Sequence, residues 1–302
     1  MTGVISTGSH PKDLWPGVAA FFGAKYDEHP TEYTSLFEVK TSRQAWEEYV
    51  HYTGFGLVPV KPEGSNVTYA SHNQQYTSRF TNVAYGMGYV VTREELDDNL
   101  YESVSTGRAE SLAFSLRQTE ENVGANVFNR AFDSNYTGGD SVELLSPSHT
   151  SPAGNWSNHL TTAADMSEAS VEDLAVQMMD ATDAKGLKVS LRPTCLVIPT
   201  ALTFEAERIF KSQLQSGTAN NDVNALRTHG TIPKIVVNHY LTDPDAWFIK
   251  SNAPKGLVWW DRQTMEFTKD QEFDSENAKA KVFRRFVPGW GDPRTLWGSP
   301  GA

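Results

Sequence analysis

The sequence predicts an α+β fold from which a long, polar β-ribbon projects. Residues 52–92 consist of strand-forming and turn-forming types but offer no usable apolar face. The longest helical pattern of the chain follows this segment, and short strand patterns fill the last third. A polar two-stranded ribbon buries too little surface to offset its chain entropy, so we expect it to rest on another subunit.

The predicted ribbon is longer than a compact body of this size. A turn signal at residues 61–66 divides it, and each arm of about 18 residues would span about 60 Å when extended. A compact body of 302 residues has a diameter of about 50 Å. The ribbon would therefore overhang its own body, which favours a role in contacts between subunits.

The N-terminal region, residues 1–40, has the pattern of an arm, because Gly, Ser, Pro and His punctuate it. Its one apolar patch, residues 14–22, is too short for a core of its own and should lie on another element. Thr41 and Gln44 form a capping box, which predicts a short helix over residues 42–51 before the ribbon begins.

A second capping box, Thr92 with Glu95, opens the long helix, which we expect to reach about residue 132. An apolar stripe at helical spacing runs along it, formed by Leu96, Leu100, Val104, Leu112, Leu116, Val123 and Val127. Gly107 and Gly124 each weaken a helix by about 1 kcal/mol relative to Ala, so we expect a kink or a break. Arg117 and Glu121 are four residues apart and should support the helix as a pair.

The remaining elements are shorter. The patterns predict a loop over residues 145–162, a helix over 171–184 opened by Ser170 and Asp173, and a buried strand over 194–199. They further predict a helix over 203–213, a polar loop over 216–231, and strands over 235–240 and 246–250 joined as a hairpin by a turn at 242–245. Strands at 257–260, 265–268 and 278–287 complete the series.

Composition restricts the classes of function. The formal net charge is −11 and no run of Lys or Arg exceeds two residues, which argues against tight nucleic-acid binding but leaves loose confinement of nucleic acid open. No apolar run approaches the roughly 18 residues of a membrane span, and the start of the chain lacks a signal-peptide pattern, so no membrane partner is expected. The single cysteine, Cys195, excludes an internal disulfide and a cysteine-rich metal site.

No catalytic motif is present: the chain has no phosphate-binding loop, no nucleophile elbow and no His-Glu-x-x-His helix. His149, His159 and Asp165 come nearest to a ligand cluster, although a solvated loop is the preferred interpretation. Cys195 lies in an apolar strand, where a buried thiol is the default over a nucleophile. We therefore expect no catalytic, cofactor-binding or metal-binding residues.

The order of segments resembles the bacteriophage major capsid protein fold of the Hong Kong 97 type. An arm, a short helix, a protruding ribbon, a long helix, an α/β module and a late return through strands follow one another. Local sequence is similar to a phage and prophage head-subunit family over residues 92–302. The similar segments are LRQT at 116–119, NVFNRAF at 126–132, YTGGD at 136–140, VVNHYLTD at 236–243, DAWFIK at 245–250, GWGDPR at 289–294 and GSPGA at 298–302.

The resemblance implies a division into domains. It gives an N-terminal arm over residues 1–40 and an extended loop over 52–92. The peripheral domain would comprise residues 41–51, 93–140, which hold the long spine helix, and 262–290. The axial domain would comprise residues 141–261, to which the C-terminal segment 291–302 returns.

The resemblance also implies a function and partners. The chain would be a major capsid protein without enzymatic activity, found in the virion and assembled in the cytoplasm of a bacterial host. Copies would form pentamers and hexamers of an icosahedral shell around double-stranded DNA, held without sequence-specific binding. Portal and scaffolding proteins would be partners, and a decoration protein is compatible with this role. Because no room is seen for a helical segment before the arm, we expect the scaffold to be a separate protein.

Contacts between subunits are expected from the arm, the ribbon, the long helix and the C-terminal part. The candidate residues are Trp15, Phe21, Lys61, Glu63, Tyr69, Arg79, Arg93, Glu102, Arg108, Arg284 and Arg294. Some relatives crosslink a ribbon lysine to a neighbour, and Lys61 is the only ribbon lysine. A plain turn residue is the preferred interpretation of Lys61.

Two alternatives stay open from sequence. The first is an encapsulin-like nanocompartment shell of the same fold, which would hold protein cargo instead of DNA. The second is a soluble α+β enzyme that uses the ribbon as a lid and gathers His149, His159 and Asp165 in a deep pocket.

Overall fold

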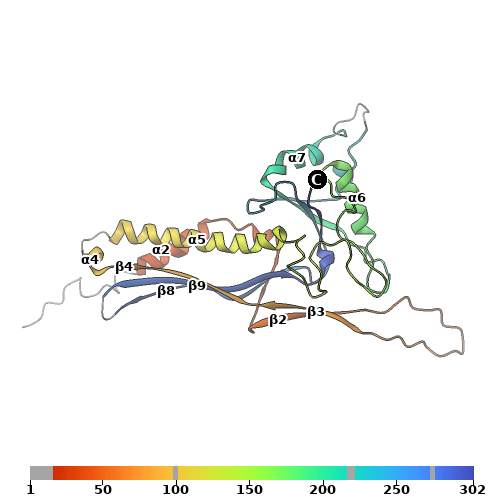
Figure 1. The fold of residues 1–302 in the computed structure, drawn as a ribbon, viewed down its shortest axis with the longest axis horizontal. Helices are drawn as coiled ribbons and strands as arrows, with labels where there is room; N and C mark the ends of the chain where they lie inside the picture. Colours follow the sequence, from red (N-terminus) through yellow and green to blue (C-terminus); the bar gives the residue numbers. More distant parts are fainter. Residues whose placement is uncertain (1–15, 98–100, 216–221, 273–275) are drawn as a thin grey trace, which may run out of the picture.

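The computed structural model describes residues 16–97, 101–215, 222–272 and 276–302. Figure 1 shows an elongated subunit in which a long sheet carries helices on one face, a second α/β module stands at one end, and a ribbon extends beneath both. Among the described residues, no helix is long and apolar enough to cross a membrane. The prediction of an α+β class is confirmed.

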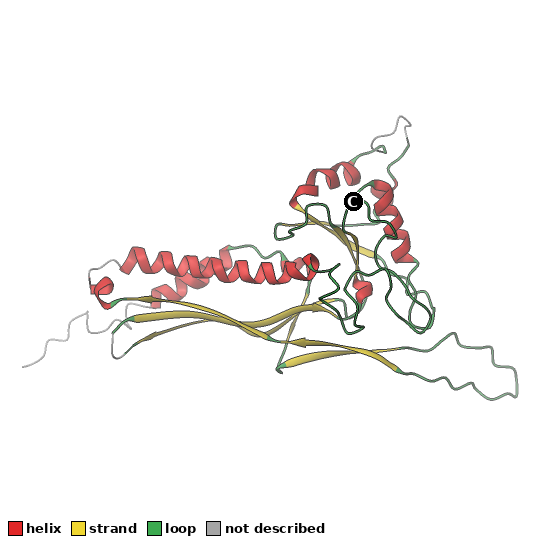
Figure 2. Ribbon diagram, in the orientation of Figure 1, coloured by secondary structure: helices red, strands yellow, loops and turns green. Residues whose placement is uncertain are grey.

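The long sheet has the strand order β1-β8-β9-β4, formed by β1 (Glu38–Thr41), β8 (Leu257–Gln271), β9 (Ala278–Trp290) and β4 (Val83–Val91). β8 and β9 are antiparallel with Leu257 opposite Trp290, β4 runs antiparallel to β9, and β1 runs parallel to β8. Two helices cover one face of this sheet, α2 (Pro16–Glu28) and α5 (Tyr101–Asn129) (Figure 2). The covered face is apolar because alternate residues of β9 turn inward, among them Ala278, Ala280 and Val282.

The second sheet has the order β10-β7-β5-β6, formed by β10 (Leu296–Ser299), β7 (Trp247–Ser251), β5 (Pro193–Pro199) and β6 (Ile235–Asn238). Its helices are α6 (Glu168–Met179), α7 (Thr203–Lys211) and α8 (Ala225–His229), and the short 3-10 turns η2 (Thr200–Leu202) and η3 (Pro293–Thr295) adjoin strands. An apolar core joins the two sheets, because Trp259 of the long sheet and Phe248 of the second sheet belong to one buried cluster. In this cluster Trp259 stacks on Phe286 with 4.5 Å between ring centroids and on Tyr33 with 4.1 Å.

The ribbon is formed by β2 (Trp46–Tyr52) and β3 (Gln74–Thr81), paired antiparallel from Trp46 opposite Thr81 to Tyr52 opposite Gln74. Beyond Tyr52 both arms continue as loop without ladder pairing, and they project past the body of the subunit (Figure 2). We call residues 53–73 the ribbon tip. The prediction of a protruding ribbon is confirmed, but only its base is a ladder. The predicted bounds of 52–92 are wrong, because residues 83–91 form β4 and pair with β9 in the long sheet.

The predicted helix over residues 42–51 is wrong, because this segment forms β2. Ser42 and Glu47 are bonded to one another, with Ser42 Oγ donating to Glu47 Oε1 at 2.9 Å, and no helix follows. The Tyr49 ring instead packs edge-on against Phe80 of β3 at 5.5 Å and lies 5.7 Å from Trp260. Pairing with β3 and these aromatic contacts outweigh a local capping signal, as tertiary context commonly does.

The N-terminal region is only partly an arm. From Pro16 the chain forms α2, and α3 (Tyr33–Leu36) follows it. Phe22 of α2 is fully buried against α5 and the long sheet. Its ring stacks on Phe267 with 4.7 Å between ring centroids. The expectation that the apolar patch lies on another element is therefore confirmed at Phe22, while Trp15 lies outside the described residues.

The long helix is confirmed with different ends. A short helix, α4 (Arg93–Asp97), precedes α5, and the residues between them lie outside the described part. Leu112, Leu116 and Val127 are buried as the stripe predicts. The predicted break at Gly107 or Gly124 is wrong, since α5 runs through both. Gly124 has a packing role, because a Cβ there would lie 3.3 Å from Tyr33 Cβ and 3.4 Å from the Trp259 ring.

Four further expectations are corrected. The strands at 235–240 and 246–250 are no hairpin, because β5 lies between β6 and β7 in the sheet. The two strands at 257–260 and 265–268 are the single strand β8. The predicted polar loop contains α8. Asn224 caps the start of this helix, because its side chain accepts the Arg227 backbone N–H at 3.1 Å. α6 begins earlier than predicted, with Ser167 as its N-cap.

Candidate intersubunit surfaces

The ribbon tip exposes apolar side chains that the subunit itself does not cover. Leu57, Val58 and Val60 are 84%, 92% and 93% exposed, and Tyr69 is 94% exposed. The two arms of the tip are tied where they leave the ladder, since the Thr53 backbone N–H donates to Asn73 O at 2.9 Å. A contiguous exposed apolar surface of this kind is typical of a protein–protein contact.

The ribbon base is fixed to the body of the subunit. Ser78 Oγ donates to Gly291 O at 3.1 Å, and Lys255 Nζ donates to Val50 O at 2.7 Å. Gly139 lies so close to the ribbon that a Cβ there would be 2.7 Å from Thr77 O. The base is therefore fixed to the body of the subunit, and the tip begins where this support ends.

His51 lies in this base and should make its stability depend on pH. Its ring stacks on Tyr76 with 4.5 Å between centroids, and its Nε2 is buried without a hydrogen-bond partner in the described structure. Burial lowers the pKa of His51, an effect that nearby Asp292 opposes and Lys255 reinforces. The folded chain thus keeps the ring neutral at pH values where the unfolded chain, with a histidine pKa of about 6.5, binds a proton. This contribution to stability is present above that pKa and is lost as the pH falls.

We expect His51→Phe to reduce the fall in thermal midpoint between about pH 7.5 and about pH 5, because the substitution removes this proton uptake by the unfolded chain. The measurement is a pair of thermal unfolding curves at the two pH values. The matched control is His72→Phe in the exposed ribbon tip, which should keep the wild-type pH dependence. Equal pH dependence in wild type and His51→Phe would contradict the assignment.

A buried ionic network joins α2, α5, β8 and β9. Glu120 is fully buried and pairs with Arg117 at 2.8 Å and with Arg284, and it accepts a hydrogen bond from Tyr26 Oη at 2.6 Å. Arg284 also pairs with Asp261 at 3.0 Å. Burial, together with Glu120, raises the pKa of the Tyr26 hydroxyl, which keeps it a donor. The sequence predicted a pair between Arg117 and Glu121. This prediction is wrong, because Arg117 pairs with Glu120.

Glu121 has a different role, as the acceptor for the start of α3. Its carboxylate accepts the backbone N–H groups of Glu32 at 2.9 Å and Tyr33 at 3.1 Å. Burial raises the pKa of Glu121, although these two N–H groups act in the opposite direction. α5 therefore holds the N-terminal helices on their own subunit through two neighbouring carboxylates.

The predicted contact residues fall into two groups, of which the first is exposed. Lys61, Glu63 and Tyr69 lie in the ribbon tip. Arg79 is exposed on β3, lies over the Trp46 ring at 4.2 Å and is 3.7 Å from Glu48. These residues remain candidates for contact with another subunit.

The second group makes contacts within the subunit. Arg284 belongs to the buried network and Arg294 donates from Nε to Thr182 O at 3.0 Å, so both have partners within their own subunit. Arg108 forms a two-pronged pair with Glu95 at 2.8 and 3.1 Å, and Arg93 pairs with Glu276 at 3.1 Å. Phe21 is half-buried against the core of the long sheet. The side chains of Trp15 and Glu102 lie outside the described residues.

The residues of the supposed enzyme site do not converge. His149 is buried, with Nδ1 2.8 Å from Asp140 Oδ2 and Nε2 3.1 Å from Asn158 Oδ1. His159 bonds the carbonyl of Leu160, and Asp165 accepts the backbone N–H of Ala302 at 3.0 Å. Among the described residues no group of His, Cys, Asp and Glu could hold a metal ion. The two histidines and the aspartate serve loop structure.

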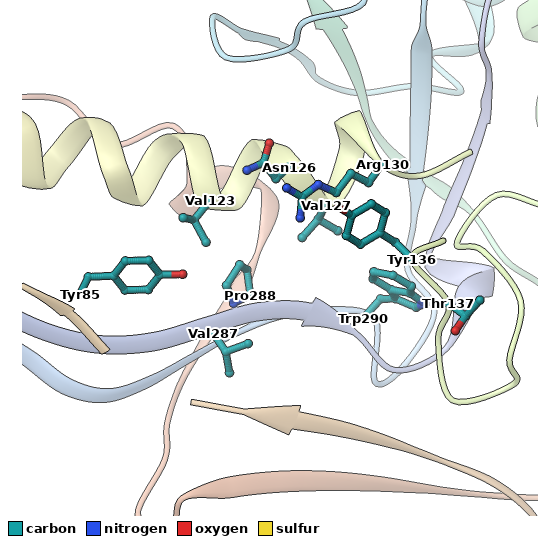
Figure 3. A pocket seen from close by; sticks show the side chains of 10 residues that line it. All are labelled: Tyr85, Val123, Asn126, Val127, Arg130, Tyr136, Thr137, Val287, Pro288 and Trp290. Atoms are coloured by element: carbon teal, nitrogen blue, oxygen red, sulfur yellow. The ribbon is translucent and has the colours of Figure 1, made fainter. Parts of the chain in front are cut away.

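A groove of about 440 Å³ lies between the end of α5 and β9. Figure 3 shows Val123 and Val127 of α5, with Arg130 just beyond its end, facing Tyr85 and Trp290 across the groove. The Arg130 guanidinium lies over the Tyr136 ring at 4.3 Å. No carboxylate, imidazole or thiol lines the groove, whose polar groups are those of Tyr85, Asn126, Arg130, Tyr136, Thr137 and Trp290.

A protein-family model described as phage capsid protein matches residues 75–298 of this chain. No curated protein matches the sequence.

Several solved structures are similar in fold. That of Mycobacterium phage Patience aligns with a TM-score of 0.56 and 11% identity, covering 99% of this chain and 89% of that one. Microbacterium phage Oxtober96 gives 0.54 and 9% identity, covering 91% and 92%. A virus-like particle from Pyrococcus furiosus gives 0.52 and 13% identity, covering 95% and 99%. At such identities the likeness shows the fold alone, and it confirms the expected fold of the Hong Kong 97 type.

Proposed function

This chain belongs to the phage capsid protein family and is a major capsid protein, and we propose that its copies close as pentamers and hexamers into an icosahedral shell around double-stranded DNA. The observation that carries this proposal is the uncovered ribbon tip, which extends from a base fixed to the body of the subunit. Its apolar side chains gain cover only when another copy packs against them.

The surface of the subunit also suits assembly. The described part of the subunit is elongated, and an elongated body exposes more surface than a compact one of the same mass (Figure 1). Neighbouring copies can cover this surface. Specific contacts of this kind bury up to about 2,000 Å² in total, and more in obligate assemblies.

The proposed partners follow from the shell. A formal net charge of −11 is compatible with a shell that does not bind packaged DNA tightly. We therefore propose that the shell confines the DNA without sequence-specific binding. Portal and scaffolding proteins, with room for a decoration protein, complete the proposed assembly in the cytoplasm of a bacterial host. We further propose that the protein performs no chemistry and that Lys61 forms no crosslink.

The proposed domains correspond to the two sheets. The long sheet with α5 would be the peripheral domain, and the second sheet with α6 and α7 would be the axial domain. Two of the three apolar cores lie beneath one sheet each and support this division, while the third is shared by both sheets. The boundary drawn from sequence at residues 261 and 262 falls inside β8, which belongs wholly to the long sheet.

The nanocompartment alternative shares the fold, as the likeness to the Pyrococcus furiosus particle illustrates. The family match favours the phage capsid, because the model that matches residues 75–298 is described as phage capsid protein. The enzyme alternative is left without its supposed cluster, since His149, His159 and Asp165 bond to different groups.

We expect the purified protein to form closed shells, because its uncovered apolar surface gains burial only in contact with other copies. Negative-stain electron microscopy with analytical sedimentation checks this, with a scaffolding protein supplied if the subunit alone stays soluble. A protein that remains a monomer under both conditions would contradict the proposal. Particles filled with a protein cargo, and free of DNA after infection or induction, would favour the nanocompartment.

A further inference from the structure

β4 is an edge strand that lacks the usual protection against strand addition. In the described structure it has β9 on one side and no strand on the other. Its sequence, VAYGMGYVV, contains no charge and no proline, and Val83, Met87 and Val90 are about half exposed or more. Natural edge strands usually carry lysine, proline or a bulge, because an uncharged edge with free backbone groups recruits further strands.

A groove runs beside this edge, between β4 and α5. Two connected hollows of about 220 and 380 Å³ share Met87, Leu112 and Ser115 in their walls. The helix contributes short residues on this side, namely Gly107, Ser111, Ser115 and Thr119. Residues 83–90 of this strand are exposed or half-buried, so the edge is accessible along most of its length. Arg108 Nη1, which pairs with Glu95, also donates to Val90 O at 3.4 Å.

One segment of the same chain has the complementary properties of an added strand. Residues 66–71, in the returning arm of the ribbon tip, are exposed and belong to no helix, strand or turn. None of them pairs with another backbone group within the described part of the chain. They carry no charge and no proline, and Val67, Thr68 and Tyr69 are strand-forming types. The outgoing arm is less suitable because Pro59 and Pro62 lack the N–H that a ladder needs.

The two surfaces cannot meet within one subunit. The ribbon tip and β4 lie toward opposite ends of its long axis (Figure 1). Any pairing must therefore join one copy to the next, and because the two surfaces differ, the contact is heterologous. Heterologous contacts close into rings when the rotation between copies allows it.

We propose that residues 66–71 of one copy add as a fifth strand to the open edge of β4 in the next copy. This inference rests on the proposed shell function and names the surface that receives the ribbon tip. The long sheet then continues from one subunit to its neighbour through backbone hydrogen bonds. Alternate side chains of the added strand, among them Val67 and Tyr69, face one side, so the groove beside α5 receives one set of them.

Disulfide trapping in assembled particles tests the pairing. Met87→Cys is combined in turn with a cysteine at each of residues 66–71, since directly opposed strand residues have the Cα separation that a disulfide needs. Native Cys195 is buried and stays in place. In oxidised shells we expect at least one pair to convert the monomer band into a ladder of joined subunits, which reductant reverses. The single-cysteine variants, and Met87→Cys with Val176→Cys on α6, should give no ladder.

A second variant tests the same edge without cysteine. Met87→Lys places a charge on the edge strand and should abolish shells while the far-ultraviolet circular dichroism of the subunit stays unchanged, whereas Val176→Lys should leave assembly intact. Shells that form normally but show no ladder above the controls, or shells of Met87→Lys, would overturn the strand addition alone. Failure of the unmodified protein to form any shell would overturn the proposed function, and the strand addition with it.

Discussion

Replacing residues 54–72 by Asn-Gly should abolish shell assembly and leave the subunit folded. The change joins Thr53 to Asn73, which already pair across the ribbon, through the two residues that favour a tight hairpin turn. It removes no residue of the three buried apolar cores. Sedimentation should show monomers or small oligomers, and the thermal midpoint should stay close to that of the intact subunit.

A milder variant separates loss of length from loss of apolar surface. Changing Leu57, Val58 and Val60 together to serine keeps the length of the ribbon. It should still remove roughly 5 kcal/mol of the free energy that burial of these side chains contributes to each contact between subunits. Val176→Ser, an exposed apolar residue on α6, is the matched control and should assemble normally. Normal shells from the shortened protein would show that the ribbon tip is dispensable, and its interpretation as an intersubunit element would be abandoned.

Glu120→Gln should destabilise the subunit by about 3–5 kcal/mol, the usual cost of removing one partner from a buried ion pair. The substitution keeps the shape of the side chain but leaves Arg117 and Arg284 with only Asp261 among the carboxylates of the network. Urea unfolding measures the loss, best in the shortened variant, where assembly does not contribute to stability.

The control for this experiment is an exposed pair of the same kind. Glu205 pairs with Arg208 on the surface of α7, and Glu205→Gln should change the free energy of unfolding by no more than about 0.5 kcal/mol. A loss at Glu120 no larger than at Glu205 would show that the network is weakly coupled to the fold. We expect a further sign of the network in limited proteolysis, where Glu120→Gln should release α2 before the rest of the subunit unfolds.

The network also explains why residues 16–28 differ from the expected arm. Arg117 donates to the carbonyl of Tyr26 at 3.0 Å and lies over its ring at 3.8 Å, while Arg284 donates to its hydroxyl at 2.7 Å. These contacts fix α2 to the spine helix of the same subunit. Rearrangement of this segment during assembly would have to break buried ion pairs, so we expect α2 to move together with α5.

Much of the architecture could be predicted from sequence because it depends on local patterns. The stripe of Leu112, Leu116 and Val127 locates α5, the continuous apolar run after Thr194 locates β5, and the alternation in β9 locates its buried face. The polarity of the ribbon indicated a segment that cannot support itself. The order of these patterns, with the similar segments between residues 116 and 302, was sufficient for the family.

Tertiary structure alone decided the features that depend on partners far apart in the chain. Residues 46–52 became a strand because β3 and Trp260 offered more contacts than a local cap. Which glutamate Arg117 would pair with depended on Arg284, which is distant in sequence, and β5 entered between β6 and β7 through pairing that no turn signal encodes. Sequence patterns indicate which face of a helix or strand is buried. Which element packs against that face depends on residues far away in the chain, so only the folded structure supplies it.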